Sequence, residues 1–206
     1  MVQSCPHCGR LNSQKLHDTW LIVCAQCHRQ AWGNTTLKEE LFEMPDDWSL
    51  IQIGSTGKYK DKPFEITGRV RLQMQNDFRN LWCATYGEKT LWISQSLESL
   101  GFFSTSFDKY PVTFYRPHAS SYIAFGDRIN LKCEIVEPCL SVRLEGELGR
   151  FPFPSTNFLF IQASNASGNT VLVLHQNDNA IQFLWGELGL VNSVSFEKTR
   201  QFDEWK

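Results

Sequence analysis

Residues 64–74 read FEITGRVRLQM, and their pattern sets the fold class. Apolar residues or glycine occupy every second position from Phe64 to Met74, and polar or charged residues stand between them. A period of two is the pattern of a β-strand whose two faces meet different surroundings. We therefore predict one long amphipathic strand here, with Arg69 and Arg71 on its polar face.

The same period continues through most of the chain after residue 50. Residues 81–86 and 90–94 flank a turn at 87–89 and predict a hairpin, and residues 157–161 and 170–174 predict a second hairpin around a turn at 165–169. The order of strand and hairpin thus recurs, at an offset of roughly 70 to 80 residues. We predict a mostly β protein with two related small antiparallel β-barrel or sandwich modules, 50–110 and 111–206. One larger pseudo-symmetric sheet would also explain the repeat.

Two Cys-x-x-Cys pairs lie in the amino-terminal stretch 5–27, CPHCGRLNSQKLHDTWLIVCAQC. Each pair can turn two thiolates toward one tetrahedral ion, and four thiolates leave no coordination position for water or substrate. Zinc is the usual metal of such sites, and iron in a rubredoxin-like site is the alternative. We predict one structural Zn²⁺ in a zinc ribbon of residues 1–36, followed by a linker of residues 37–49. The predicted ligands are Cys5, Cys8, Cys24 and Cys27.

The remaining residues near this site have simpler interpretations. Residues 19–23 predict a strand that leads into Cys24, and His7 and His28 are interpreted as exposed loop histidines because four cysteines already complete the site. Residues 37–42 predict one helical turn within the linker. We expect Cys24→Ser to release the metal and loosen the ribbon while the β modules stay folded.

Composition excludes several functional classes. The 206 residues carry a formal net charge of −2, and residues 37–110 hold nine Lys/Arg against eleven Asp/Glu, so no broad basic field is present. No apolar run approaches the roughly 20 residues that cross a bilayer, and no signal peptide is recognised at the start. Seven cysteines, four of them in metal spacing, are typical of a reducing compartment. We therefore expect a cytoplasmic protein.

Several motifs in order resemble an uncharacterised bacterial family, a domain of unknown function. They are Gly54-x-x-Gly57, Phe64-x-Ile66-x-Gly68-Arg69, Asn80-x-Trp82, Leu91-Trp92-Ile93 and Glu145-Gly146-Glu147. Members of that family often carry an amino-terminal zinc ribbon and lie near genes for membrane-stress or polyamine-related proteins. The resemblance implies a mostly β accessory protein of a multi-protein system. Its acidic residue between Asn and Trp is Leu81 here, so any role of that acid does not transfer.

Three functions follow from these features. We favour a non-enzymatic zinc-binding adaptor that binds another protein, because a closed metal site accompanies β modules without a recognisable catalytic or cofactor-binding set. The first alternative is a nucleic-acid binder that uses the ribbon and a polar stripe containing Arg69 and Arg71. The second is an enzyme that uses Glu145 and Glu147, whose carboxylates would share one strand face with Arg143. Cys83, Cys133 and Cys139 are interpreted as buried small hydrophobic residues rather than a second metal site.

Overall fold

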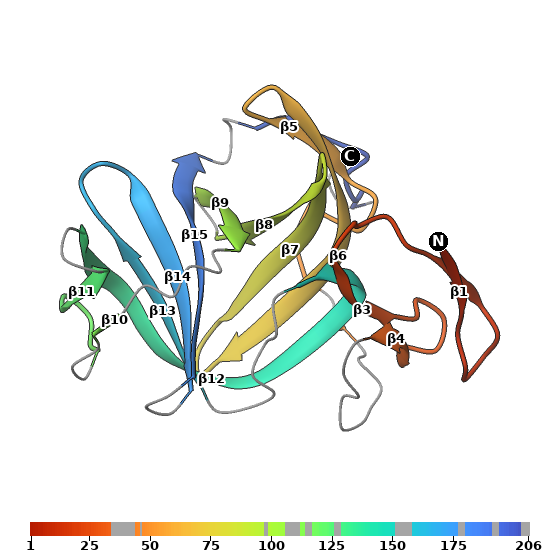
Figure 1. The fold of residues 1–206 in the computed structure, drawn as a ribbon, viewed down its shortest axis with the longest axis horizontal. Helices are drawn as coiled ribbons and strands as arrows, with labels where there is room; N and C mark the ends of the chain where they lie inside the picture. Colours follow the sequence, from red (N-terminus) through yellow and green to blue (C-terminus); the bar gives the residue numbers. More distant parts are fainter. Residues whose placement is uncertain are drawn as a thin grey trace.

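The protein is a β structure throughout the part of the chain described by the computed structural model, namely residues 1–33, 44–45, 47–96, 99–105, 112–113, 117–125, 129–150, 158–176, 180–190 and 194–202 (Figure 1). The strands in chain order are β1 (Val2–Ser4), β2 (Leu11–Ser13), β3 (Thr19–Val23), β4 (Gln30–Gly33), β5 (Thr56–Tyr59), β6 (Lys62–Met74), β7 (Phe78–Tyr86), β8 (Lys89–Gln95), β9 (Ser99–Thr105), β10 (Val112–Thr113), β11 (Tyr122–Phe125), β12 (Ile129–Gly149), β13 (Phe158–Ser164), β14 (Asn169–Gln176), β15 (Ala180–Leu190) and β16 (Phe196–Glu197). The predicted fold class, mostly β with antiparallel strands, is confirmed.

The predicted elements around the two hairpins are also confirmed. The strand predicted over residues 64–74 lies within β6, and the two hairpins are β7–β8 and β13–β14. The strand predicted over residues 19–23 is β3. The helical turn predicted at residues 37–42 lies outside the described residues. Over the described part of the chain, no helix is long and apolar enough to cross a membrane.

Antiparallel pairing joins β6, β7, β8, β9, β15, β14, β13 and β12 in that order within the described residues, and β12 then pairs with β6 to complete a circuit. The 21-residue strand β12 makes this closure (Figure 1). It pairs with β13 from Lys132 to Cys139 and with β6 from Cys139 to Gly146. Every strand of the circuit therefore has two neighbours, which β12 contacts over successive parts of its length.

The two halves of the chain therefore share one hydrogen-bonded sheet. β15 pairs with β9 from Leu184↔Thr105 to Leu190↔Ser99, and β12 pairs with β6, so both junctions cross the predicted boundary at residue 110. The prediction of two separate barrel or sandwich modules is not confirmed. The pairing agrees with the alternative in that both halves lie in one sheet, and the similarity of the two halves stays a prediction.

A β-bulge at Thr67 divides strand β6 into two parts. Ile66 pairs with Ala84 and Gly68 pairs with Cys83, so Thr67 is the extra residue on the bulged strand. The bulge reverses which face successive side chains occupy. Phe64 and Ile66 lie in one apolar cluster, whereas Val70, Leu72 and Met74 lie in another. The single alternation predicted from Phe64 to Met74 is therefore wrong, and Arg69 and Arg71 lie on the same face as Phe64 and Ile66.

Three apolar clusters use both faces of the sheet. The largest collects side chains from strands of both halves, among them Trp92, Phe103, Phe160 and Leu172. A second cluster lies on the other face of β6 to β9 and includes Ile51 and Trp82. The third lies on the other face of β13 to β15 and includes Ile123 of β11. Apolar residues that alternate between two clusters explain why strands such as β8 and β14 are almost fully buried.

Candidate metal centre

Two short loops with the same backbone geometry carry the four cysteines of the ribbon. In the first loop the amide of Cys5 donates to the Arg10 carbonyl and that of Gly9 to the Cys5 carbonyl, at 2.8 and 2.9 Å. In the second loop, the amides of Cys24 and His28 donate in the same way to Arg29 and Cys24. Gly9 and His28, at equivalent positions, both adopt positive φ, 76° and 53°. Each loop thereby turns its pair of sulfurs to one side.

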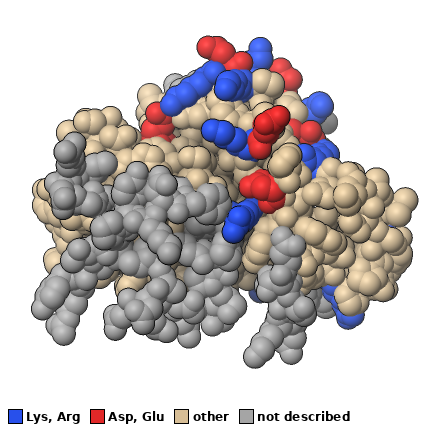
Figure 2. All heavy atoms as spheres, in the orientation of Figure 1, with Lys and Arg blue, Asp and Glu red and all other residues tan. Residues whose placement is uncertain are grey.

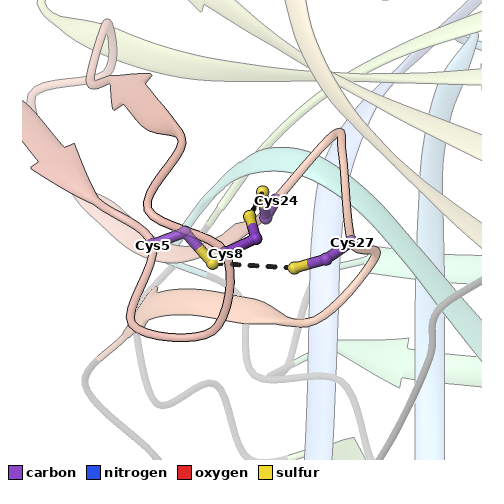
Figure 3. A group of neighbouring side chains, drawn as sticks. All are labelled: Cys5, Cys8, Cys24 and Cys27. Atoms are coloured by element: carbon purple, nitrogen blue, oxygen red, sulfur yellow. Dashed lines mark hydrogen bonds between the residues drawn. The ribbon is translucent and has the colours of Figure 1, made fainter.

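The four sulfur atoms converge between the two loops (Figure 3). Cys5 Sγ lies 3.6 Å from Cys27 Sγ, and Cys8 Sγ lies 3.6 Å from Cys24 Sγ. All four lie within 4.8 Å of one another. A tetrahedral ion with bonds of about 2.3 Å separates its sulfur ligands by ~3.8 Å. The residues therefore fit a four-cysteine metal site, and neither His7 nor His28 belongs to the group found over the described residues.

The local electrostatics favour a thiolate at Cys24. Burial opposes ionisation of this thiol, but backbone amides of Cys27 and Gln26 hydrogen-bond to its sulfur, and together these effects give a pKa of about 7. Cys5 and Cys24 are buried while Cys8 and Cys27 are partly exposed. A bound cation would stabilise the thiolate form of all four residues.

The ribbon is joined to the main sheet rather than set apart from it. Strand β3 pairs with the end of β12 through Ile22↔Glu147 and Leu21↔Leu148. Trp20, Leu21 and Val23 belong to the largest apolar cluster, while Ile22 packs beside the cysteines. Side chains of this one strand therefore contact both the metal loops and the sheet interior.

Glu147 reinforces this junction. Its carboxylate accepts hydrogen bonds from the amides of Lys15 and Leu16, at 2.8 and 3.0 Å, and from the Thr19 hydroxyl at 2.5 Å. Lys15 and Leu16 belong to the turn between β2 and β3, Thr19 is the first residue of β3, and Glu147 itself is buried. Three hydrogen-bond donors from the protein compensate this buried carboxylate for the loss of water. We interpret Glu147 as a structural residue that holds the ribbon turn against β12.

Glu145 and Glu147 do not form the shared open face that the sequence predicted. Gly146 between them has φ of 70°, which interrupts the regular alternation of β12. Glu145 binds Arg69, with its Oε2 atom 3.0 Å from Nε and 2.9 Å from Nη2, whereas Glu147 binds the ribbon turn. The prediction that the two carboxylates project together from one exposed strand face is therefore wrong.

The predicted polar stripe is also not an accessible basic surface. Arg69 and Arg71 are only 3% and 7% exposed. Asp47 covers them, with its Oδ2 atom 2.7 Å from Arg69 Nη1 and 3.2 Å from Arg71 Nη1. Sequence reasoning placed Asp47 in a linker and missed this role. The sequence signal for such a partner was the position of two arginines in the middle of a strand with many apolar residues. Buried cations require buried anionic partners.

The other charged residues visible on one face of the molecule are mixed in sign. Figure 2 shows most of them toward the top of the view, in the region of β5 in Figure 1, with basic and acidic side chains interspersed.

Cys83, Cys133 and Cys139 are all buried, which confirms their interpretation as small core residues. Burial also raises the pKa of the Cys83 thiol to about 12, despite a hydrogen bond from the Gly149 amide.

A cavity of about 180 Å³ near β5 was not predicted. Tyr59 stacks on Phe102 at a centroid distance of 4.2 Å and donates to Glu187 at 2.6 Å. Lys60 pairs with the same carboxylate at 3.0 Å. The lining residues are Lys58, Tyr59, Lys60, Phe102, Glu187, Gly189 and Val194. These contacts attach the β5 hairpin to β15.

The fold and this site together define a mostly β protein with a candidate four-cysteine metal centre. No protein-family model, curated protein or solved structure matches the chain significantly. The resemblance to the uncharacterised bacterial family therefore stays a prediction.

Proposed function

We propose that this protein is a non-enzymatic, zinc-bound adaptor that binds another protein within a bacterial multi-protein system. One structural Zn²⁺ on Cys5, Cys8, Cys24 and Cys27 holds its amino-terminal ribbon. Zinc is favoured over iron because it is the usual ion of paired Cys-x-x-Cys loops. Elemental analysis of protein purified without chelators is expected to give one zinc per chain, and stoichiometric iron would contradict the assignment.

The observation that carries the proposal is an exposed apolar face on the hairpin β1–β2. Val2 pairs with Ser13 and Ser4 pairs with Leu11, so these four side chains share one face. Val2 and Leu11 are 61% and 69% exposed on that face, and Met1 beside them is also exposed. In the described part of the chain, β1 and β2 pair only with each other. Exposed apolar side chains on a metal-fixed hairpin are suited to bind an apolar surface of a partner.

The two alternative functions have less support. Nucleic-acid binding through Arg69 and Arg71 would require surfaces that Asp47 covers. Catalysis by Glu145 and Glu147 would require two free carboxylates, and both are bound to other groups. The adaptor proposal needs neither set of residues. A link to membrane stress is suggested only by the gene neighbours of the resembling family.

The test compares the proteins that are captured by the wild type and by two variants. Wild type, Val2→Asp/Leu11→Asp and the control Leu190→Asp, at another exposed apolar position, are used as bait in native bacterial lysate. We expect a stoichiometric partner with wild type and the control and its loss with the double variant. The metal content and circular dichroism of all three baits should agree. No stoichiometric partner of wild type, or equal capture by the double variant, would contradict the proposal.

A further inference from the structure

Asp47 lies in a cluster of donors that has the form of an oxyanion site. Its Oδ2 atom accepts from Arg69 Nη1 at 2.7 Å, from Asn80 Nδ2 at 3.1 Å and from Arg71 Nη1 at 3.2 Å. Its Oδ1 atom accepts from the amide of Ser49 at 3.1 Å, and Arg200 Nη1 lies 3.6 Å away. The Asp47 side chain is 1% exposed. Guanidinium and amide donors in this arrangement bind carboxylates and phosphates alike.

Strands β6 and β7 carry three of these donors, Arg69, Arg71 and Asn80, and hold them in place independently of Asp47. Arg71 and Asn80 are register partners, as are Arg69 and Trp82. The Arg69 guanidinium lies 4.9 Å from the Trp82 ring centroid, and that of Arg71 lies 3.6 Å from the Phe78 ring centroid. Stacking on an aromatic ring fixes the plane of a guanidinium and leaves its N–H edge for an anion. The donor set is therefore preorganised by the sheet.

Among the ion pairs of the described residues, the charges around Asp47 do not balance. Arg69, Arg71 and Arg200 supply three positive charges, while Asp47 and Glu145 supply two negative charges. Arg143 and Asp77 also act on Arg71, with opposite charges. In addition, the Nε donor of Arg71 is buried without a hydrogen-bond acceptor in the described structure. Buried donors are rarely left without an acceptor. A dianion in place of the Asp47 carboxylate would neutralise the cluster and offer further acceptor oxygens.

The carboxylate comes from a segment that is neither strand nor helix. Residues 47–49 have no regular secondary structure, and Trp48 between the buried Asp47 and Ser49 is exposed. The Arg71 Nη1 atom also contacts the Pro45 carbonyl at 3.3 Å. The segment is held by hydrogen bonds from Ser49 Oγ to Gln95 Oε1, 2.7 Å, and from Arg200 Nη1 to the Asp47 carbonyl, 3.0 Å. Its departure would break these bonds but no strand pairing.

We propose that Arg69, Arg71 and Asn80 form a binding site for a phosphate group and that Asp47 occupies this site in the present structure as an internal competitor. The phosphate oxygens would replace the carboxylate oxygens between the guanidinium groups and also accept from Arg71 Nε. This site is independent of the proposed adaptor face on β1–β2.

The test uses the full-length protein with inorganic phosphate as the probe. Wild type, Asp47→Ala and Asp47→Ala/Arg69→Gln are titrated by calorimetry and by thermal melting, with chloride added to keep the ionic strength constant. We expect Asp47→Ala to bind phosphate at least about tenfold more tightly than wild type and to gain thermal stability with phosphate by mass action. The double variant should lose this response. Sulfate, which is also tetrahedral and has the charge of the hydrogen phosphate dianion, should act like phosphate.

Asp47→Asn is the second variant, because it removes the charge and keeps the volume of the side chain. If either single variant is unfolded in chloride, phosphate is expected to restore folding. Equal phosphate affinity of wild type and both single variants would overturn the proposal. An undiminished response of the double variant, or unfolded single variants that phosphate does not restore, would overturn it as well.

Discussion

Gly68 and Gly146 face each other across β6 and β12, and neither position has room for a side chain. A Cβ at Gly68 would approach the carbonyl oxygens of Glu145 and Glu147 to less than 3.0 Å, and one at Gly146 would approach the Thr67 carbonyl. Gly146 also has positive φ, and Gly68 directly follows the Thr67 bulge. The two glycines thus let the backbones of β6 and β12 come together where the sheet closes.

Gly68→Ala should therefore strain the closure of the sheet. The added methyl group meets backbone rather than a movable side chain, so we expect a loss of about 1–3 kcal/mol or more in the free energy of unfolding. Urea unfolding followed by tryptophan fluorescence measures it. Gly87→Ala is the comparison, because that turn glycine has open space around its Cβ position and loses only its positive-φ preference, about 1 kcal/mol. A loss no larger at Gly68 than at Gly87 would contradict the close approach of the two strands.

Metal removal should weaken the whole sheet, in contrast to the expectation from the sequence. Trp20, Leu21 and Val23 of the ribbon strand pack in the largest apolar cluster, so loosening the ribbon exposes part of that cluster. We expect a loss of about 3 kcal/mol in the free energy of unfolding, which is well below the ~10 kcal/mol of metal binding in isolated zinc fingers. A loss of about 3 kcal/mol would lower Tm by roughly 6–12 °C. Calorimetry of Cys24→Ser or of chelated wild type measures this change.

His7→Ala is the control for metal removal, because His7 lies inside the first loop and is not part of the four-cysteine group. It should retain the metal and the wild-type Tm. Release of the metal from Cys24→Ser without any change in Tm would mean that the ribbon folds separately from the sheet.

Glu147→Gln should destabilise the ribbon junction. The buried carboxylate accepts from Lys15, Leu16 and Thr19, and an amide has one oxygen to accept with and places an NH₂ group against donors. We expect a loss of about 1–3 kcal/mol in the free energy of unfolding, measured by urea titration. Glu137→Gln, at an exposed position of the same strand, should change it by less than about 0.5 kcal/mol. Equal effects of the two substitutions would show that Glu147 has no special role.

The contact between Tyr59 and Glu187 should make the stability of the protein depend on pH in both the acid and the alkaline range. Hydrogen bonds from Tyr59 and Lys60 lower the pKa of Glu187, so their stabilising contribution is present above about pH 4.5 and is lost as the pH falls through the lower pKa of the folded state. Burial and the Glu187 contact raise the pKa of Tyr59 to about 12. Between about pH 10 and 12 the unfolded chain releases a proton that folded Tyr59 keeps, so stability falls as pH rises.

Tyr59→Phe removes the effect at alkaline pH and the Tyr59 contribution to the effect at acid pH, while Lys60 still pairs with Glu187. The urea midpoint of this variant should differ from that of wild type near pH 7, and the difference should shrink below about pH 4 and above about pH 10. Tyr122→Phe serves as the control, because that tyrosine is 70% exposed. A difference between wild type and Tyr59→Phe that is constant over the whole pH range would argue against the coupling of Tyr59 to Glu187.

Local sequence patterns determined a large part of this structure. The four cysteines converge as their spacing predicted, and the two hairpins form where alternation and turn residues placed them. These features depend on residues close in the chain, so spacing and period suffice to predict them. The three remaining cysteines are buried for the same reason that small apolar residues are.

Tertiary contacts decided the features that depend on distant strands. The bulge at Thr67 reversed the faces of β6, because its register is fixed by pairing with β7 and β12, and the period of two gives no sign of an extra residue. Asp47 reaches Arg69 across 22 positions of sequence, and Glu147 reaches the ribbon turn across more than 120. In the local sequence pattern, Asp47, Arg69 and Glu147 have the appearance of surface residues. They are buried in the structure, because tertiary folding brings their partners within hydrogen-bond distance.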